Sequence, residues 1–129
     1  MEYIKWKEDL SVGLESIDNQ HKELFRLINA FYNSLAANSG KAAILQAIID
    51  MEKYTTVHFT EEEAMMRQAN YPHFAEHRKQ HQGFIETVAD FRARYEEGRM
   101  LLSLEVGGFV KKWIVDHIMK TDQQYRGKI

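Results

Sequence analysis

Hydrophobic residues recur three or four positions apart along four stretches of the sequence, and polar residues fill the positions between them. This spacing is the period of an α-helix that buries one face. Small, polar or turn-forming residues interrupt it at 36–40, 69–72 and 96–99. Hydrophobic and polar residues do not alternate over several positions, so β structure is not expected. The pattern predicts an all-α protein with helices at about 18–37, 41–67, 72–96 and 103–122.

Helices of about 20 residues joined by short loops pack beside one another in opposite directions. The expected fold is therefore an up-down-up-down antiparallel four-helix bundle. Residues 1–17 precede the first helix and are expected to form an arm against the outside of the bundle. Its apolar contacts would come from Tyr3, Ile4, Trp6 and Val12. A length of 129 residues suits a single domain over residues 1–129.

The amino-acid composition argues against several classes of function. Seventeen Lys and Arg accompany nineteen Asp and Glu, and such an interspersed, nearly neutral balance argues against nucleic acid as a partner. No run approaches the roughly 18 apolar residues of a membrane span. The first residues lack the apolar core of a signal peptide, so a cytoplasmic protein is expected. The chain has no cysteine, so a bound transition metal would have to use imidazole and carboxylate groups.

Five of the six histidines lie on the apolar stripe of a predicted helix. A single histidine in such a position is usually an ordinary core residue. Here His58 and Glu62 are four residues apart, as are His77 and His81, so each pair shares one helix face. The sixth histidine, His73, lies beside a proline at a helix start and is expected on the surface.

The expected topology brings these side chains to one end of the bundle. The first and third helices start there, and the second and fourth end there. The converging residues are His21, His58, Glu62, His77, His81 and His117. Burying them without partners would cost several kcal/mol. The convergence therefore predicts a metal centre.

Asp122 follows His117 by five residues, which on a regular helix turns its side chain about 140° away. It can point inward only if the helix ends or bulges there. Spacing alone leaves a metal ligand and a solvated aspartate equally open.

Ligand chemistry narrows the metal centre further. The stretch from His77 to His81 lacks the glutamate of an H-E-x-x-H zinc hydrolase. Five histidines and two carboxylates exceed the four ligands of a structural zinc, and ferritin-like di-iron oxidases are richer in carboxylates. The count suits two metals, with one carboxylate or both bridging, but imidazole suits iron, copper and zinc alike.

At these residues the sequence resembles the hemerythrin family in its single-domain bacterial form, bacteriohemerythrin. The resemblance covers essentially the whole chain. It rests on a combination of motifs: Trp6, Ser11-Val12-Gly13, Ile17-Asp18-Asn19-Gln20-His21, His58-Phe59-Thr60-Glu61-Glu62, His77-Arg78-Lys79-Gln80-His81 and His117-Ile118-Met119-Lys120-Thr121-Asp122. Each pair of ligands alone is a weak signal, whereas their combination in one short chain is specific.

The resemblance implies a di-iron centre. One iron would be bound by His77, His81 and His117, and the other by His21 and His58. Two carboxylates and an oxo or hydroxo group would bridge them, namely Glu62 and Asp122. The second iron would keep one open position, where dioxygen binds end-on and is reduced to peroxide.

The implied function is reversible dioxygen binding, for carriage, storage or delivery, and the protein is not expected to be an enzyme. A protein acceptor of oxygen is a further expected partner. A dry pocket would favour release of unchanged oxygen, and its candidate walls are Phe25, Phe59, Trp113, Ile114 and Ile118. Two other classes stay open: a sensor of oxygen, nitric oxide or iron, and a peroxidase-like or nitric-oxide-reducing di-iron enzyme.

Overall fold

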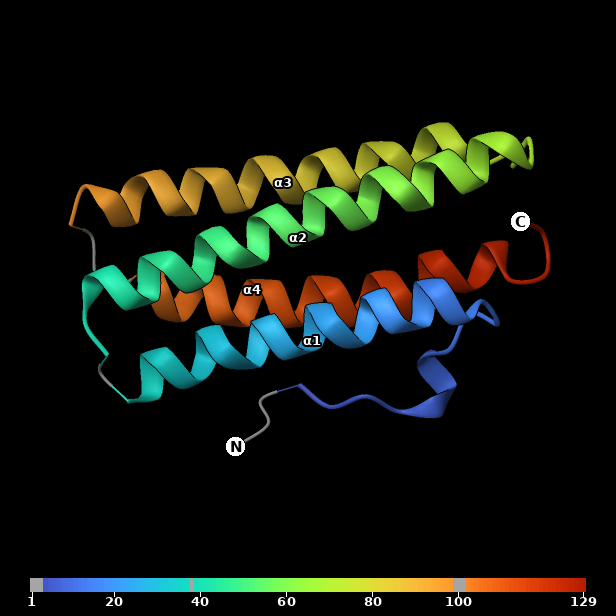
Figure 1. Ribbon diagram of the computed structural model, residues 1–129. Coiled ribbons are helices and arrows are strands. Elements are labelled where there is room, and N and C mark those ends of the chain that lie inside the picture. The colour runs from blue at the N-terminus through green and yellow to red at the C-terminus, as the bar shows by residue number, and fades with distance from the viewer. Residues whose placement is uncertain (1–3, 38, 99–101) are drawn as a thin grey trace.

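The computed structural model describes residues 4–37, 39–98 and 102–129, with side chains from residue 108 onward in the last range. In these ranges the chain forms four α-helices and no strand. The helices are α1 (Glu15–Ala36), α2 (Lys41–Gln68), α3 (Phe74–Glu96) and α4 (Leu102–Asp116). Figure 1 shows them as an antiparallel bundle in which each helix runs opposite to the one before it. The predicted all-α four-helix bundle is confirmed.

One apolar stripe of each helix faces the bundle axis. Ile28, Phe31, Ile48 and Met51 are fully buried where α1 packs on α2, and Val88 extends the same core from α3. The short connections use residues that tolerate positive φ, with Gly40 at φ 92° before α2 and Asn70 at φ 53° after it. Tight turns at these two points place consecutive helices side by side.

The segment before α1 lies along the bundle and includes the short helix η1 (Glu8–Leu10). Ile4 and Val12 are buried, and Trp6 meets Phe25 edge-on with ring centroids 5.9 Å apart. The side chain of Asn29 exchanges two hydrogen bonds with the backbone of Ile4, at 2.8 and 2.9 Å. The described part of the arm therefore packs as expected, whereas Tyr3 lies outside the described residues.

Helix α1 begins at Glu15, three residues before the predicted start. The side chain of Asp18 explains the earlier start, because it accepts hydrogen bonds from the Ser11 hydroxyl at 2.5 Å and from the Val12 amide at 2.9 Å. This carboxylate in the first turn accepts hydrogen bonds from the residues that lead into the helix, and its negative charge complements the helix dipole.

The fourth helix differs most from the prediction of a regular helix over 103–122. Its regular part ends at Asp116 and continues as a π-helical turn, η2 (His117–Thr121), and a 3₁₀ turn, η3 (Asp122–Tyr125). A π turn hydrogen-bonds residues five apart, so His117 and Asp122 come to lie one turn apart on the same face. This is the bulge that an inward-pointing Asp122 requires.

A second apolar cluster closes the end of the bundle where α1 and α3 begin. It consists of Val12, Ile17, Met66, Tyr71 and Tyr125, each at most 4% exposed. These residues come from the arm, α1, α2, the connection to α3 and η3, and they join these five segments. Their side chains fill the interior at this end of the bundle.

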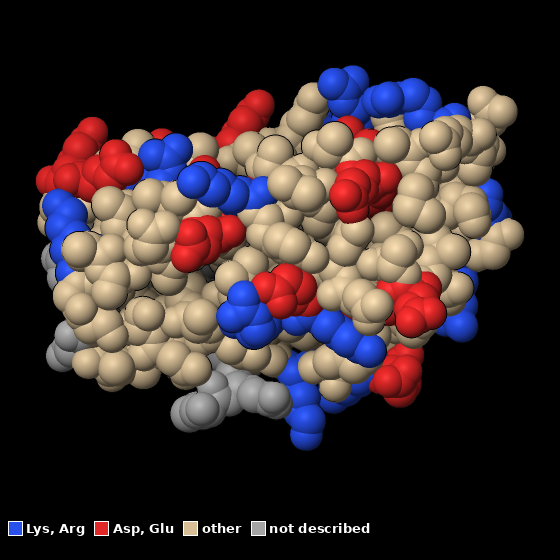
Figure 2. Space-filling view, in the orientation of Figure 1, with Lys and Arg blue, Asp and Glu red and all other residues tan. Residues whose placement is uncertain are grey.

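On the face seen in Figure 2, Lys and Arg side chains are interspersed with Asp and Glu and form no extended area of one charge. No helix in the part of the chain that is described is long and apolar enough to span a membrane.

Candidate metal centre

All seven residues predicted as metal ligands lie together at this same end of the bundle, and each is at most 5% exposed. In Figure 1 the starts of α1 and α3 and the ends of α2 and α4 meet at this end. The contributing residues are His21 on α1, His58 and Glu62 on α2, His77 and His81 on α3, His117 on η2 and Asp122 on η3. The topology therefore produces the predicted convergence.

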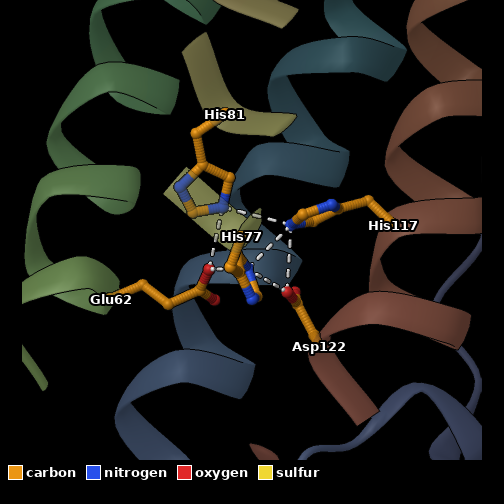
Figure 3. A group of neighbouring side chains, drawn as sticks. All are labelled: Glu62, His77, His81, His117 and Asp122. Carbon is orange, nitrogen blue, oxygen red and sulfur yellow. Dashed lines mark hydrogen bonds and ion pairs between the residues drawn. The ribbon is translucent and has the colours of Figure 1, made fainter. Parts of the chain in front are cut away.

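The larger group holds five residues whose ligand atoms lie within 4.8 Å of one another. Figure 3 shows their side chains pointing to a common centre: Glu62, His77, His81, His117 and Asp122. Glu62 Oε1 lies 3.0 Å from His77 Nε2 and 3.1 Å from His81 Nε2. Asp122 Oδ1 lies 2.9 Å from His77 Nε2 and 3.0 Å from His117 Nε2.

The smaller group contains His21, His58 and again Glu62. Glu62 turns its other oxygen, Oε2, towards this group, 3.5 Å from His58 Nε2 and 3.7 Å from His21 Nε2. Asp122 does the same, since its Oδ2 lies 3.2 Å from His21 Nε2. Each carboxylate thus presents one oxygen to each group, which is the arrangement of a bridge between two metals.

The outward nitrogens of three imidazoles fix their tautomers. His58, His81 and His117 each have Nδ1 within hydrogen-bond distance of an oxygen, belonging to Gln20 (2.6 Å), Glu63 (2.8 Å) and Gln80 (3.0 Å) respectively. An oxygen acceptor requires a proton on Nδ1, so the Nε2 lone pair of each neutral ring points inward.

The inward lone pairs are crowded. His117 Nε2 lies 3.1 Å from both His77 Nε2 and His81 Nε2. Lone pairs at this distance repel unless a proton or a metal ion lies between them. Both oxygens of Asp122 and Nε2 of His21 are buried and make no hydrogen bond within the described part of the chain. Bound metal ions satisfy all these atoms together, and the cluster fits a metal-binding site.

Without metal, the carboxylates keep protons on part of the cluster. Burial alone would lower the pKa of His21 and His77, but Asp122 and Glu62 outweigh it and raise both pKa values to about 9. Burial lowers the pKa of His58 to about 4. Burial also opposes charge on the two carboxyl groups, yet the surrounding histidines hold the pKa of Glu62 and of Asp122 well below the usual range. Two imidazolium ions then neutralise two carboxylates where metals would otherwise do so.

The family model described as Hemerythrin HHE cation binding domain matches residues 12–129. The chain belongs to the hemerythrin family. This confirms the resemblance carried by the histidine and carboxylate motifs.

Individual hemerythrins match over nearly the whole of this chain. The bacteriohemerythrin of Pseudomonas paraeruginosa is 35% identical over 127 residues, which are 97% of this chain and 80% of that protein. Myohemerythrin-1 of Phascolopsis gouldii is 33% identical over 124 residues, covering 96% of this chain and 92% of its own. The crystal structure of a wild-type hemerythrin superposes with a TM-score of 0.91 at 26% identity, covering 98% of this chain and 97% of that one.

The hemerythrin centre of this chain has aromatic walls. Phe59 stacks on His81 with ring centroids 3.7 Å apart, and Trp113 stacks on His117 at 4.4 Å. Tyr125, which the sequence analysis did not single out, donates a 2.8 Å hydrogen bond from its hydroxyl to Glu62 Oε2. Burial and the nearby carboxylates raise the pKa of Tyr125, so this phenol keeps its proton at neutral pH.

The outer hydrogen-bond partners Gln20, Glu63 and Gln80 were likewise absent from the sequence prediction. Gln20 and Gln80 directly precede His21 and His81, and Glu63 directly follows Glu62, but hydrophobic spacing carries no signal for their contacts. His73, by contrast, lies where it was expected. It is exposed at the start of α3, its ring meets Tyr71, and it does not belong to either group of potential ligands among the described residues.

The raised pKa values predict how the metal-free protein responds to pH. The folded pKa of His21 and of His77 is about 9, against an ordinary value of 6.5, so their protonation stabilises the fold fully below pH 6.5. That contribution is lost as pH rises through about 9. We expect the melting temperature of the metal-free protein to fall between pH 6.5 and 9.

The metal-loaded protein is the control, because its imidazoles are already deprotonated by metal binding. Its melting temperature should be higher throughout and change less over the same interval, as measured by scanning calorimetry. Equal melting temperatures with and without metal, or equal pH slopes, would contradict this account of the centre.

Proposed function

We propose that this chain binds two iron ions and holds dioxygen reversibly at one of them. The observation that carries the proposal is the unequal division of donors around two shared carboxylates. Five residues surround one position, whereas the other has His21 and His58 besides the shared Glu62 and Asp122. Membership of the hemerythrin family supports iron as the metal.

In this proposal His77, His81 and His117 bind the first iron, and His21 and His58 bind the second. Glu62 and Asp122 would bridge the two irons, together with an oxo or hydroxo group. The first iron would then have a full set of ligands, and the second would keep one open position. Dioxygen, the proposed ligand, would bind at that open position.

The irons, when bound, supply the electrons that hold dioxygen. The residues of the chain determine whether it leaves unchanged. Neutral imidazoles add no negative charge, and the buried side chains Phe25, Ile114 and Ile118 belong to the apolar core rather than to a water channel. The Tyr125 hydroxyl lies beside Glu62 but retains its proton. These features favour a carrier over a peroxidase-like or nitric-oxide-reducing enzyme.

A protein acceptor for released oxygen belongs to the same proposal. The cytoplasmic location stays a prediction from the sequence. A sensor would use the same centre, and no contact of the described residues favours that role over carriage.

Rapid mixing tests carriage directly. The diferrous protein, with two irons per chain confirmed by metal analysis, is mixed with dioxygen and followed by absorption spectroscopy. We expect a stable oxygenated spectrum that reverts to the diferrous spectrum under argon. Rapid conversion to the diferric form with consumption of oxygen would instead indicate an enzyme, and one zinc per chain with no iron uptake would contradict the proposed centre.

Two histidines on either side of the α3 start test the assignment of ligands. His77→Ala removes a donor of the five-residue group and should lose at least one iron per chain. The matched control, His73→Ala, removes an exposed imidazole four residues away and should leave iron content and the oxygenated spectrum unchanged. If the control bleaches the centre, the division into five ligands and one bystander is wrong.

Ile114 is the candidate for keeping water from the bound oxygen. It lies one turn before His117 on α4 and is 2% exposed. Ile114→Ala leaves a cavity in the core, so the free energy of unfolding should fall by about 2–5 kcal/mol. If Ile114 excludes the water that would deliver a proton, the variant should also oxidise faster in air.

Ile48→Ala provides the comparison, because Ile48 is equally buried on α2 but lies ten residues before His58. Both variants should lose stability in denaturant titrations, and only Ile114→Ala should accelerate autoxidation. Equal autoxidation rates in the two variants would make Ile114 an ordinary core residue.

A further inference from the structure

The outward nitrogens of the five clustered histidines do not have equivalent partners. Gln20 and Gln80 offer neutral amide oxygens to His58 and His117, at 2.6 and 3.0 Å. The buried Nδ1 atoms of His21 and His77 have no hydrogen-bond partner among the described residues. Within that same set, His81 is the one whose outer nitrogen faces a carboxylate.

That carboxylate is Glu63, whose Oε2 lies 2.8 Å from His81 Nδ1. The contact is largely screened from water, since the side chains of His81 and Glu63 are 1% and 16% exposed. The second oxygen of Glu63 forms an ion pair with Nε of the exposed Arg78, at 3.6 Å. Its neighbour in the sequence, Glu62, points the other way, into the centre.

Among the described residues, the Glu63 carboxylate therefore meets the outer nitrogen of a histidine in only one of the two groups of donors. His81 belongs to the five-residue group, whereas His58 in the smaller group meets an amide. A carboxylate that accepts the outer N–H of an imidazole makes its other nitrogen a stronger donor to a metal. A stronger donor stabilises the more highly charged oxidation state, and hydrogen bonding to ligands is an established control of iron reduction potentials.

We propose that Glu63 is a positioning residue that sets the redox asymmetry of the centre. Through His81 it makes the iron of the five-residue group easier to oxidise than the iron that takes up oxygen. This inference rests on the proposed di-iron function. Because dioxygen is held by electrons drawn from the irons, the same contact also strengthens oxygen binding.

Glu63→Gln tests the inference, since it keeps the size and an oxygen acceptor but removes the charge. The reduction potential of the iron-loaded protein should become more positive, by a change of about tenfold in the equilibrium constant, or about 59 mV for one electron. The oxygen dissociation constant should rise with it. Glu86→Gln removes the same charge from an exposed position further along α3 and should change neither quantity.

A rescue variant separates redox tuning from a structural effect. Gln80→Glu in the Glu63→Gln background moves the carboxylate from His81 to His117, which belongs to the same group of donors. The potential should return towards the wild-type value. A merely structural role for Glu63 predicts no such return, and its absence would count against the proposal.

The hydrogen bond can also be observed without iron. In the zinc-loaded protein, proton NMR should show the Nδ1 proton of His81 further downfield than that of His117, and Glu63→Gln should remove the difference. Equal shifts in the wild type would contradict the carboxylate contact.

The possible failures are distinguishable. A wild-type protein that does not take up two irons overturns the proposed function. A Glu63→Gln protein that holds two irons at the wild-type potential overturns the role of Glu63. If Glu63→Gln loses iron, the single variant Gln80→Glu is measured in its place. It should lower the reduction potential of the iron-loaded protein, and an unchanged potential would refute the proposal.

Discussion

Crowding of inward-facing lone pairs is the constraint on which this structure depends. In the interior, His117 Nε2 lies 3.1 Å from Nε2 of His77 and from Nε2 of His81, beside two carboxylates that are fully buried. Such an arrangement is stable only with cations between the groups. The raised pKa values of His21 and His77 favour protons in this place when no metal is bound, and metal ions that bind the same nitrogens displace these protons. The second apolar cluster, which includes Tyr125, and the outer hydrogen bonds to the imidazoles keep these atoms in place.

The helix irregularity at the end of α4 is part of the same arrangement. A regular helix would direct Asp122 away from His117, so its carboxylate would not lie between the two groups of histidines. The π turn over His117–Thr121 costs regular hydrogen bonding but lets Asp122 present one oxygen to each group of histidines. Helix geometry and metal chemistry are thus coupled at this end of the bundle.

Much of this organisation was predictable from the sequence. The i, i+4 pairs His58–Glu62 and His77–His81, combined with antiparallel topology, place the donors at one end, and the structure brings them together there. The position of Asp122 could not be derived from periodicity, because it depends on a local π turn that hydrophobic spacing does not encode. Family resemblance supplied that residue. The contacts of Glu63 and Tyr125 also depend on packing between helices, so they became visible only in three dimensions.

In the proposed centre, two metals share Glu62 and Asp122. A crystal structure of the iron-loaded protein with anomalous data at the iron absorption edge tests it most directly. We expect two iron peaks roughly 3–4 Å apart, one among His77, His81 and His117 and the other beside His21 and His58, with both carboxylates reaching both irons. A single iron peak, or a second iron bound away from His21 and His58, would contradict it.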